Sequence, residues 1–267
     1  MCFLGVVPLD VNTVDIQILG IQPYFFFACI AVAAAVCCFT FLLVLKDYRI
    51  EPHLEALGIS LLGLMLGARL FGCLSGIYRA IGKEETLTMD TVLQTGIVFY
   101  GGLFGLLAVY HVLANRPEKV RSPETMDLLI VTVPLFHTIA RVGCFFGGCC
   151  FGIPWKGVFA ICYTTRNMSA VVTEYRFPVQ LAEALFNLIL FVYLVILVSR
   201  RDWKEKSLTR RYLWIYSTGR FLLEFFRGDA VRGIVGNLSF GQMISLLVWI
   251  GLTGSGIHQK IILKREC

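Results

Sequence analysis

The stretch PYFFFACIAVAAAVCCFTFLLVL, at Pro23–Leu45, contains no charged side chain. An α-helix rises about 1.5 Å per residue, so a run of this length covers the roughly 30 Å of hydrocarbon in a bilayer. No small-residue cleavage site accompanies this run, so we expect it to remain as a transmembrane span. Further apolar runs, separated by short polar loops, follow along the chain. The pattern predicts a helical protein that crosses a membrane several times.

The composition supports this class and excludes two others. Of the 267 residues, 57% are apolar and only 16% are charged, whereas soluble domains carry about 25% charged residues. The 21 Phe and 10 Tyr residues exclude a disordered chain. The net charge of +6 does not indicate nucleic-acid binding, because the basic residues lie mostly in short loops and form no cluster interleaved with aromatic residues.

The apolar runs predict an all-α polytopic protein with about seven transmembrane helices in a single membrane domain, residues 1–267. The longest connection, Gly147 to Val179, is expected to form a partly ordered surface segment. Lys and Arg are about twice as frequent in the loops of one side as in those of the other, which predicts an external N-terminus and a cytoplasmic C-terminus. The predicted spans lie near residues 23–45, 54–74, 92–113, 126–146, 180–198, 211–226 and 238–263.

Charged residues inside the predicted spans indicate a functional site. Placing an Arg at the centre of a bilayer costs at least about 2.5–3.5 kcal/mol of free energy. Arg69, Arg141 and Arg220 lie inside predicted spans, each in the half nearer the extracytoplasmic side. Arg220 and Glu224 lie four residues apart on one predicted helix, where they can form an ion pair that serves the site or merely neutralises both charges. Because Arg binds phosphate through paired hydrogen bonds, we predict a lipid-headgroup pocket that opens to the extracytoplasmic side. Further polar residues near the same ends are Tyr24, Tyr100, Gln180, Glu183, Ser239 and Gln242.

The thiols of Cys144, Cys149 and Cys150 follow Arg141 closely, and several roles are open to them. They could form a redox pair, supply a nucleophile or bind a soft metal. They could also pack as small side chains, which the glycines spaced four apart around them favour. Neither a second C-x-x-C motif nor a nearby His completes a four-ligand site, so we predict no metal. His137 is expected to be a hydrogen-bonded core residue.

Six motifs occur in the order and topology of one known family. They are GAR (Gly67–Arg69), FYGGLFG (Phe99–Gly105), ARVGCFFGGCCFG (Ala140–Gly152), FPVQLAE (Phe177–Glu183), GRFLLEFFRG (Gly219–Gly228) and LSFGQMIS (Leu238–Ser245). The chain thereby resembles the prolipoprotein diacylglyceryl transferases. This resemblance implies transfer of diacylglyceryl from phosphatidylglycerol to the lipobox cysteine of a preprolipoprotein. It also implies a multi-pass protein of the bacterial cell membrane, with its active site on the extracytoplasmic side and no metal or soluble cofactor.

The resemblance carries site residues over to matching positions of this chain. Its implied catalytic residues are Arg141, Arg220, Glu224 and Tyr100. Its implied substrate-binding residues are Tyr24, Arg69, Gly101, Gly102, Cys144, Cys149, Gln180, Glu183, Ser239, Gly241 and Gln242.

The chain departs from the family pattern at several positions. Tyr100 stands where the family motif has His, Cys144 and Gly147 where its signature has Asn, and Cys149 where it has Glu. The general base is therefore open between Glu224 and Tyr100, since a phenol with an ordinary pKa near 10 accepts protons poorly at neutral pH. Two alternatives follow: a paralogue with other lipid or thiol chemistry at the cysteines, or a non-catalytic phospholipid-binding membrane protein. A carrier is not favoured, because the chain lacks two related halves with paired helix breaks.

Overall fold

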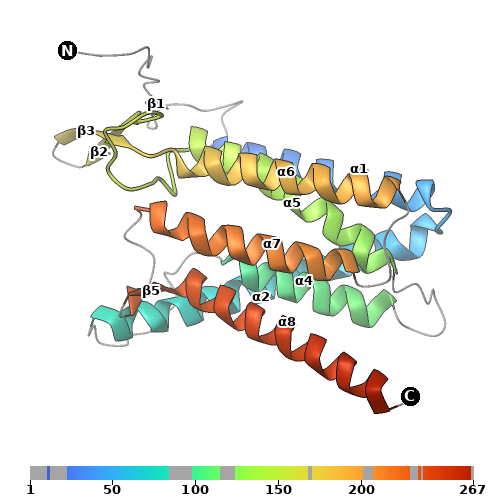
Figure 1. The fold of residues 1–267 in the computed structure, drawn as a ribbon. Helices are drawn as coiled ribbons and strands as arrows, with labels where there is room; N and C mark the ends of the chain where they lie inside the picture. The colour runs from blue at the N-terminus through green and yellow to red at the C-terminus, as the bar shows by residue number, and fades with distance from the viewer. Residues whose placement is uncertain are drawn as a thin grey trace. The chain divides into compact units, whose positions relative to one another are not determined.

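The computed structural model describes residues 11–12, 23–83, 98–114, 124–167, 170–200, 207–228, 234–235 and 237–265. Helices dominate these residues, with small strands between them (Figure 1). The α-helices of the described residues are α1 (Pro23–Leu45), α2 (Ile50–Lys83), α4 (Phe99–Ala114), α5 (Glu124–Phe146), α6 (Val179–Ser199), α7 (Ser207–Leu223) and α8 (Phe240–Arg265).

The chain forms two compact units, each assembled from separate stretches of sequence. The first unit comprises Met1–Cys38, Thr132–Ile196 and Leu222–Asp229. The second unit comprises Phe39–Val131, Leu197–Phe221 and Ala230–Cys267.

Several helices have the length and polarity of membrane spans, as predicted. Within the described residues, α1, α2 up to Gly82, α5 and α6 are long and apolar enough to cross a bilayer. Helix α4 and the Phe240–Ser255 part of α8 are apolar but shorter. The total of seven spans and the orientation of the termini stay predictions.

Helix α2 is longer than the predicted span of residues 54–74, because it continues to Lys83. Tertiary contacts stabilise this extension. The hydroxyl of Tyr78 donates to the carbonyl of Leu238 at 3.1 Å, and its ring lies 5.6 Å from that of Phe240. The third predicted span begins in the structure at Phe99, and residues 92–97 lie outside the described part of the chain.

The all-α prediction is wrong for two short sheets. Strands β2 (Ile161–Asn167) and β3 (Ala170–Arg176) pair antiparallel, with Ile161 opposite Arg176, and β1 (Val11–Asn12) pairs parallel with β2. Strands β4 (Ile234–Val235) and β5 (Leu238–Ser239) form the second sheet. The β-branched and aromatic residues of β2 and β3 favour strands, so much of the connection expected to be only partly ordered is a β-hairpin.

Helices α2 and α4 of the second unit pack against each other, and glycines line their contact. A β-carbon at Gly67 would overlap the carbonyl oxygen of Gly101, and one at Gly101 would overlap that of Gly67. One helical turn away, a β-carbon at Gly63 would lie 2.6 Å from the carbonyl oxygen of Gly105. Such paired small residues let two backbones approach closely. Gly101, expected at the substrate, is therefore required by helix packing.

Small-residue packing is also confirmed at the end of α5 in the first unit. A β-carbon at Gly143 would overlap the β-carbon of Phe27 of α1, and one at Gly147 would lie 3.2 Å from the ring of Tyr24. The ring of Phe27 stacks on that of Phe146 with centroids 5.6 Å apart. These contacts fix the end of α5, from which the next segment begins.

Helix α8 begins with a reciprocal capping box. The backbone N–H of Ser239 donates to the Gln242 side-chain oxygen at 2.9 Å, and the backbone N–H of Gln242 donates to the Ser239 hydroxyl at 3.2 Å. This arrangement satisfies two amide groups that a helix N-terminus otherwise leaves unpaired. Both side chains, expected at the substrate, thus have a local structural role.

Candidate functional site

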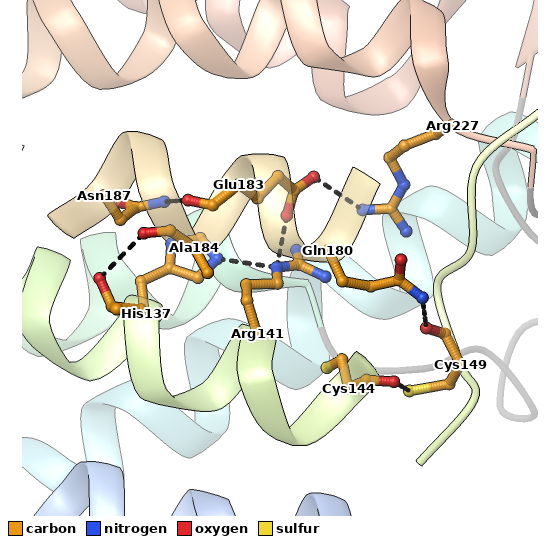
Figure 2. A network of polar contacts seen from close by, with 10 residues as sticks. His137, Arg141, Cys144, Cys149, Gln180, Glu183, Ala184, Asn187 and Arg227 are labelled. Carbon is orange, nitrogen blue, oxygen red and sulfur yellow. Dashed lines mark hydrogen bonds and ion pairs between the residues drawn. The ribbon is translucent and has the colours of Figure 1, made fainter. Parts of the chain in front are cut away.

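An ion network in the first unit joins α5, α6 and the segment that carries Arg227. Arg141 of α5 pairs with the Glu183 carboxylate of α6, and Arg227 Nη1 lies 3.7 Å from the other oxygen of that carboxylate (Figure 2). The Glu183 side chain is only 3% exposed. The Glu183 carboxylate thus faces two guanidinium groups, one at each of its oxygens. The network therefore brings Arg141 and Arg227 to one buried carboxylate.

Arg141 is held by one edge of its guanidinium group. Its Nε–H donates to Nε2 of His137, one turn earlier on α5, at 3.1 Å and also faces Glu183 (Figure 2). Within the described part of the chain, no hydrogen bond engages its two terminal nitrogens. His137 is 4% exposed and hydrogen-bonded, as predicted. The arrangement fixes Arg141 while leaving its two-nitrogen end able to receive an anion.

Gln180 links α6 to two neighbouring segments. Its side-chain N–H donates to the Cys149 carbonyl at 2.8 Å (Figure 2), and its oxygen accepts a hydrogen bond from the Tyr163 hydroxyl at 3.2 Å. Burial raises the pKa of Tyr163 to about 12, so this phenol stays neutral and serves as a donor. Gln180, expected at the substrate, therefore positions the β-hairpin and the cysteine-bearing turn.

The three cysteines gather where α5 ends. The Sγ atoms of Cys144, Cys149 and Cys150 all lie within 4.8 Å of one another. Hydrogen bonds donated by the thiols of Cys144 and Cys149, together with the charges of Arg141 and Arg227, lower the pKa of Cys150 despite its burial. The pKa of Cys149 is raised, because its thiol is hydrogen-bonded to Cys144 and Cys150. The charges of both arginines therefore act on the cysteine cluster as well as on Glu183.

Backbone contacts between three distant segments hold Arg227 in place. The N–H of Gly152 donates to the Phe177 carbonyl at 3.1 Å, and the N–H of Gly228 donates to the Phe151 carbonyl at 3.1 Å. A β-carbon at Gly152 would overlap the Phe177 carbonyl oxygen, so glycine is needed for this close approach. The segment that carries Arg227 is thus fastened to the chain just beyond the cysteines.

Two other candidates of the first unit, Glu224 and Tyr24, differ from expectation. Glu224 lies outside the α-helix predicted for it, and Tyr24 is exposed. Glu224 is 3% exposed, but α7 ends at Leu223 and Glu224 begins a 3-10 turn, Glu224–Phe226. The prediction that Arg220 and Glu224 share one α-helix is therefore wrong by a single residue. Tyr24 is 39% exposed.

The remaining candidates belong to the second unit. Tyr100 is buried, and its hydroxyl lies 2.8 Å from the Ser245 hydroxyl, which in turn donates to the Gly241 carbonyl at 2.9 Å. Arg69 is exposed on α2, and Arg220 is half-buried on α7. Gly102 is buried against α2. A β-carbon added at Gly102 would lie 3.4 Å from the β-carbon of Ala68. That all candidates share one pocket stays a prediction.

Sequence reasoning did not single out Arg227, Tyr163 or the anchoring role of His137. Arg227 follows the sixth predicted span and therefore resembles a loop residue, although it is the last residue but one of the GRFLLEFFRG motif. That motif placed it three residues after Glu224, and this spacing could have drawn attention to it. Tyr163 lies outside the six motifs. Its contact with Gln180 depends on the fold of the β-hairpin, which the sequence did not predict.

Comparison with known proteins matches the family model for prolipoprotein diacylglyceryl transferase over residues 12–255. The chain belongs to the prolipoprotein diacylglyceryl transferase family. The phosphatidylglycerol–prolipoprotein diacylglyceryl transferase of Clostridium tetani is 32% identical over 75% of this chain and 78% of its own length. The second such transferase of Clostridium perfringens is 26% identical over 77% of this chain and 78% of its own length. That of Chlorobaculum tepidum is 35% identical over 57% of this chain and 52% of its own length. The resemblance found in the six motifs is confirmed.

Proposed function

We propose that this chain transfers the diacylglyceryl group of phosphatidylglycerol to the lipobox cysteine of a preprolipoprotein. Membership of the family and the names of its relatives support this activity. The structural observation that carries the proposal is Arg141, fixed through Nε and presenting two terminal nitrogens. These nitrogens match a phosphate in the paired geometry that Arg favours.

The reaction breaks one C–O bond and forms one C–S bond. The lipobox thiolate attacks the glyceryl carbon that bears the phosphate, a thioether forms, and glycerol phosphate leaves with the electron pair of the broken bond. Negative charge grows on the leaving oxygen as that bond breaks. Arg141 stabilises this charge, and its guanidinium group is already oriented before reaction by its contacts with His137 and Glu183.

The thiol proton requires a base, and we assign this role to Glu224. A carboxylate is ionised at neutral pH and can accept a proton, whereas a phenol such as that of Tyr100 is protonated. Glu224 is buried in the same unit as Arg141. Glu183 is not assigned this role, because its carboxylate already pairs with Arg141 and faces Arg227.

Replacing Glu224 by Gln should lower the transfer rate about 10²–10⁴-fold, the usual contribution of a general base. The measurement is thioether formation on a lipobox peptide with phosphatidylglycerol vesicles, followed over pH. Glu51→Gln, at an exposed carboxylate in the first turn of α2, serves as the matched control and should retain the rate. A loss seen in Tyr100→Phe but absent from Glu224→Gln would transfer the role to Tyr100.

We propose that the chain is a multi-pass protein of the bacterial cell membrane and that its active site faces the extracytoplasmic side. Lys156 and Arg200 are exposed at opposite ends of the chain segment from α5 to α6, which makes them probes of orientation. In intact cells, a membrane-impermeant maleimide should label Lys156→Cys, and label Arg200→Cys only after permeabilisation. The parent protein sets the background from native cysteines. The reverse labelling pattern would invert the proposed topology.

A further inference from the structure

The cluster of Cys144, Cys149 and Cys150 has the geometry of a three-coordinate metal site. Cys144 lies in the last turn of α5, and the other two follow the helix end. Gly148 and Cys150 adopt left-handed φ angles of 63° and 59°, which turn the chain back on the helix. The Cys149 N–H donates to the Cys144 carbonyl at 3.1 Å, so the backbone itself holds these two residues together.

The spacing of the sulfur atoms fits an ion at their centre. Metal–thiolate bonds of about 2.3 Å place three sulfurs in a plane about 4 Å apart. In the protein all three Sγ atoms lie within 4.8 Å of one another, and each cysteine is half-buried. Small side-chain rotations therefore suffice to complete the triangle.

The charges around the cluster identify the class of ion. Three thiolates around a monovalent ion carry a net charge of −2. The guanidinium groups of Arg141 and Arg227 act electrostatically on Cys150 and also face Glu183, so they offset part of this excess. Zn²⁺ prefers four ligands, and no fourth His, Cys, Asp or Glu joins the group among the described residues. From the sequence, this missing ligand argued against any metal, but a soft monovalent ion is satisfied by three thiolates.

We propose that Cys144, Cys149 and Cys150 form a thiolate site for Cu(I). Ordinary packing accounts for Gly143 and Gly147, because the absence of a side chain at these positions leaves room for Phe27 and Tyr24. The contacts of these glycines do not account for three sulfur atoms that lie within 4.8 Å of one another at the end of a helix. The proposal does not rest on the proposed transfer reaction, and its test does not depend on activity.

The test is a Cu(I) titration of the reduced full-length protein in detergent, without oxygen, in competition with a chromophoric Cu(I) chelator. Wild type should retain one more equivalent of Cu(I) than Cys144→Ser/Cys149→Ser/Cys150→Ser. X-ray absorption of that equivalent should show about three sulfur ligands and no nitrogen. Cys29→Ser and Cys37→Ser/Cys38→Ser, at apolar-helix cysteines outside the cluster, should retain the wild-type stoichiometry.

A measurement on the unmodified protein guards against a triple variant that fails to fold. One equivalent of Cu(I) should protect Cys144, Cys149 and Cys150 from alkylation, as mapped by mass spectrometry, whereas the same three cysteines of the copper-free protein should be alkylated. Equal Cu(I) retention by wild type and the triple variant, unprotected cluster cysteines, or preferential retention of Zn²⁺ would each overturn the proposal. Loss of transferase activity bears on the proposed function alone.

Discussion

Replacing Arg141 by Ala should lower diacylglyceryl transfer by about 10²–10³-fold, the usual loss when one fixed donor to a developing negative charge is removed. The guanidinium group is held by His137 and Glu183 through one edge, and its other two nitrogens are the proposed phosphate ligands. Arg141→Lys keeps the charge but loses the paired geometry, so its rate should fall between those of Arg141→Ala and wild type. The measurement is thioether formation, together with rescue of a bacterium depleted of its own transferase.

Stability must be separated from chemistry in this experiment. Removing one partner of a buried ion pair costs about 3–5 kcal/mol, and Arg141→Ala leaves Glu183 with Arg227. Membrane abundance and thermal unfolding are therefore measured beside the rate. Arg210→Ala removes an exposed arginine from α7 and should behave as wild type. Wild-type transfer by a folded Arg141→Ala protein would refute the assigned phosphate role.

Replacing Gly67 by Ala should destabilise the protein by about 3 kcal/mol, the upper part of the range for inserting a methyl group into a filled contact. The new β-carbon would overlap the carbonyl oxygen of Gly101. The obstacle is backbone rather than a flexible side chain, so α2 and α4 have to move apart. The midpoint of thermal unfolding in detergent measures this loss.

Helix α2 offers its own control. A β-carbon at Gly58 meets nothing within 4 Å, and this glycine is exposed. Gly58→Ala should therefore stabilise the protein by up to about 1 kcal/mol, because alanine favours the helical backbone. If Gly67→Ala and Gly58→Ala shifted the unfolding midpoint equally, the close crossing of α2 and α4 would be contradicted.

Sequence reasoning was strongest where one physical demand dominated. The uniformly apolar run at Pro23–Leu45 predicted α1 with both ends correct. The intramembrane charges led to Arg141 and Glu183, which the structure pairs. Both inferences rest on the high cost of placing polar groups in hydrocarbon, which acts locally and is visible in a single sequence.

The rest depended on which segments meet. The contact of Gly67 with Gly101 requires a particular helix crossing, and glycine spacing on one helix does not name its partner. Ser239 and Gln242 have the S-x-x-Q spacing of a capping box, a pattern readable in the sequence. The family resemblance instead predicts that both residues bind the substrate. The sequence did not predict the β-hairpin, because its mixture of polar and apolar residues resembles a loop between two spans.

The late position of Arg227 has a consequence for biogenesis. Arg141 and Glu183 both precede Arg227 in the sequence, so a shortened chain that stops before Arg227 keeps the residues of the first ion pair but lacks the second guanidinium group. In the folded protein that group is held near Glu183 by the docking of the Gly228 segment beside Phe151. A premature stop codon before Arg227 is therefore expected to leave the network incomplete even where the helices of the first unit are present.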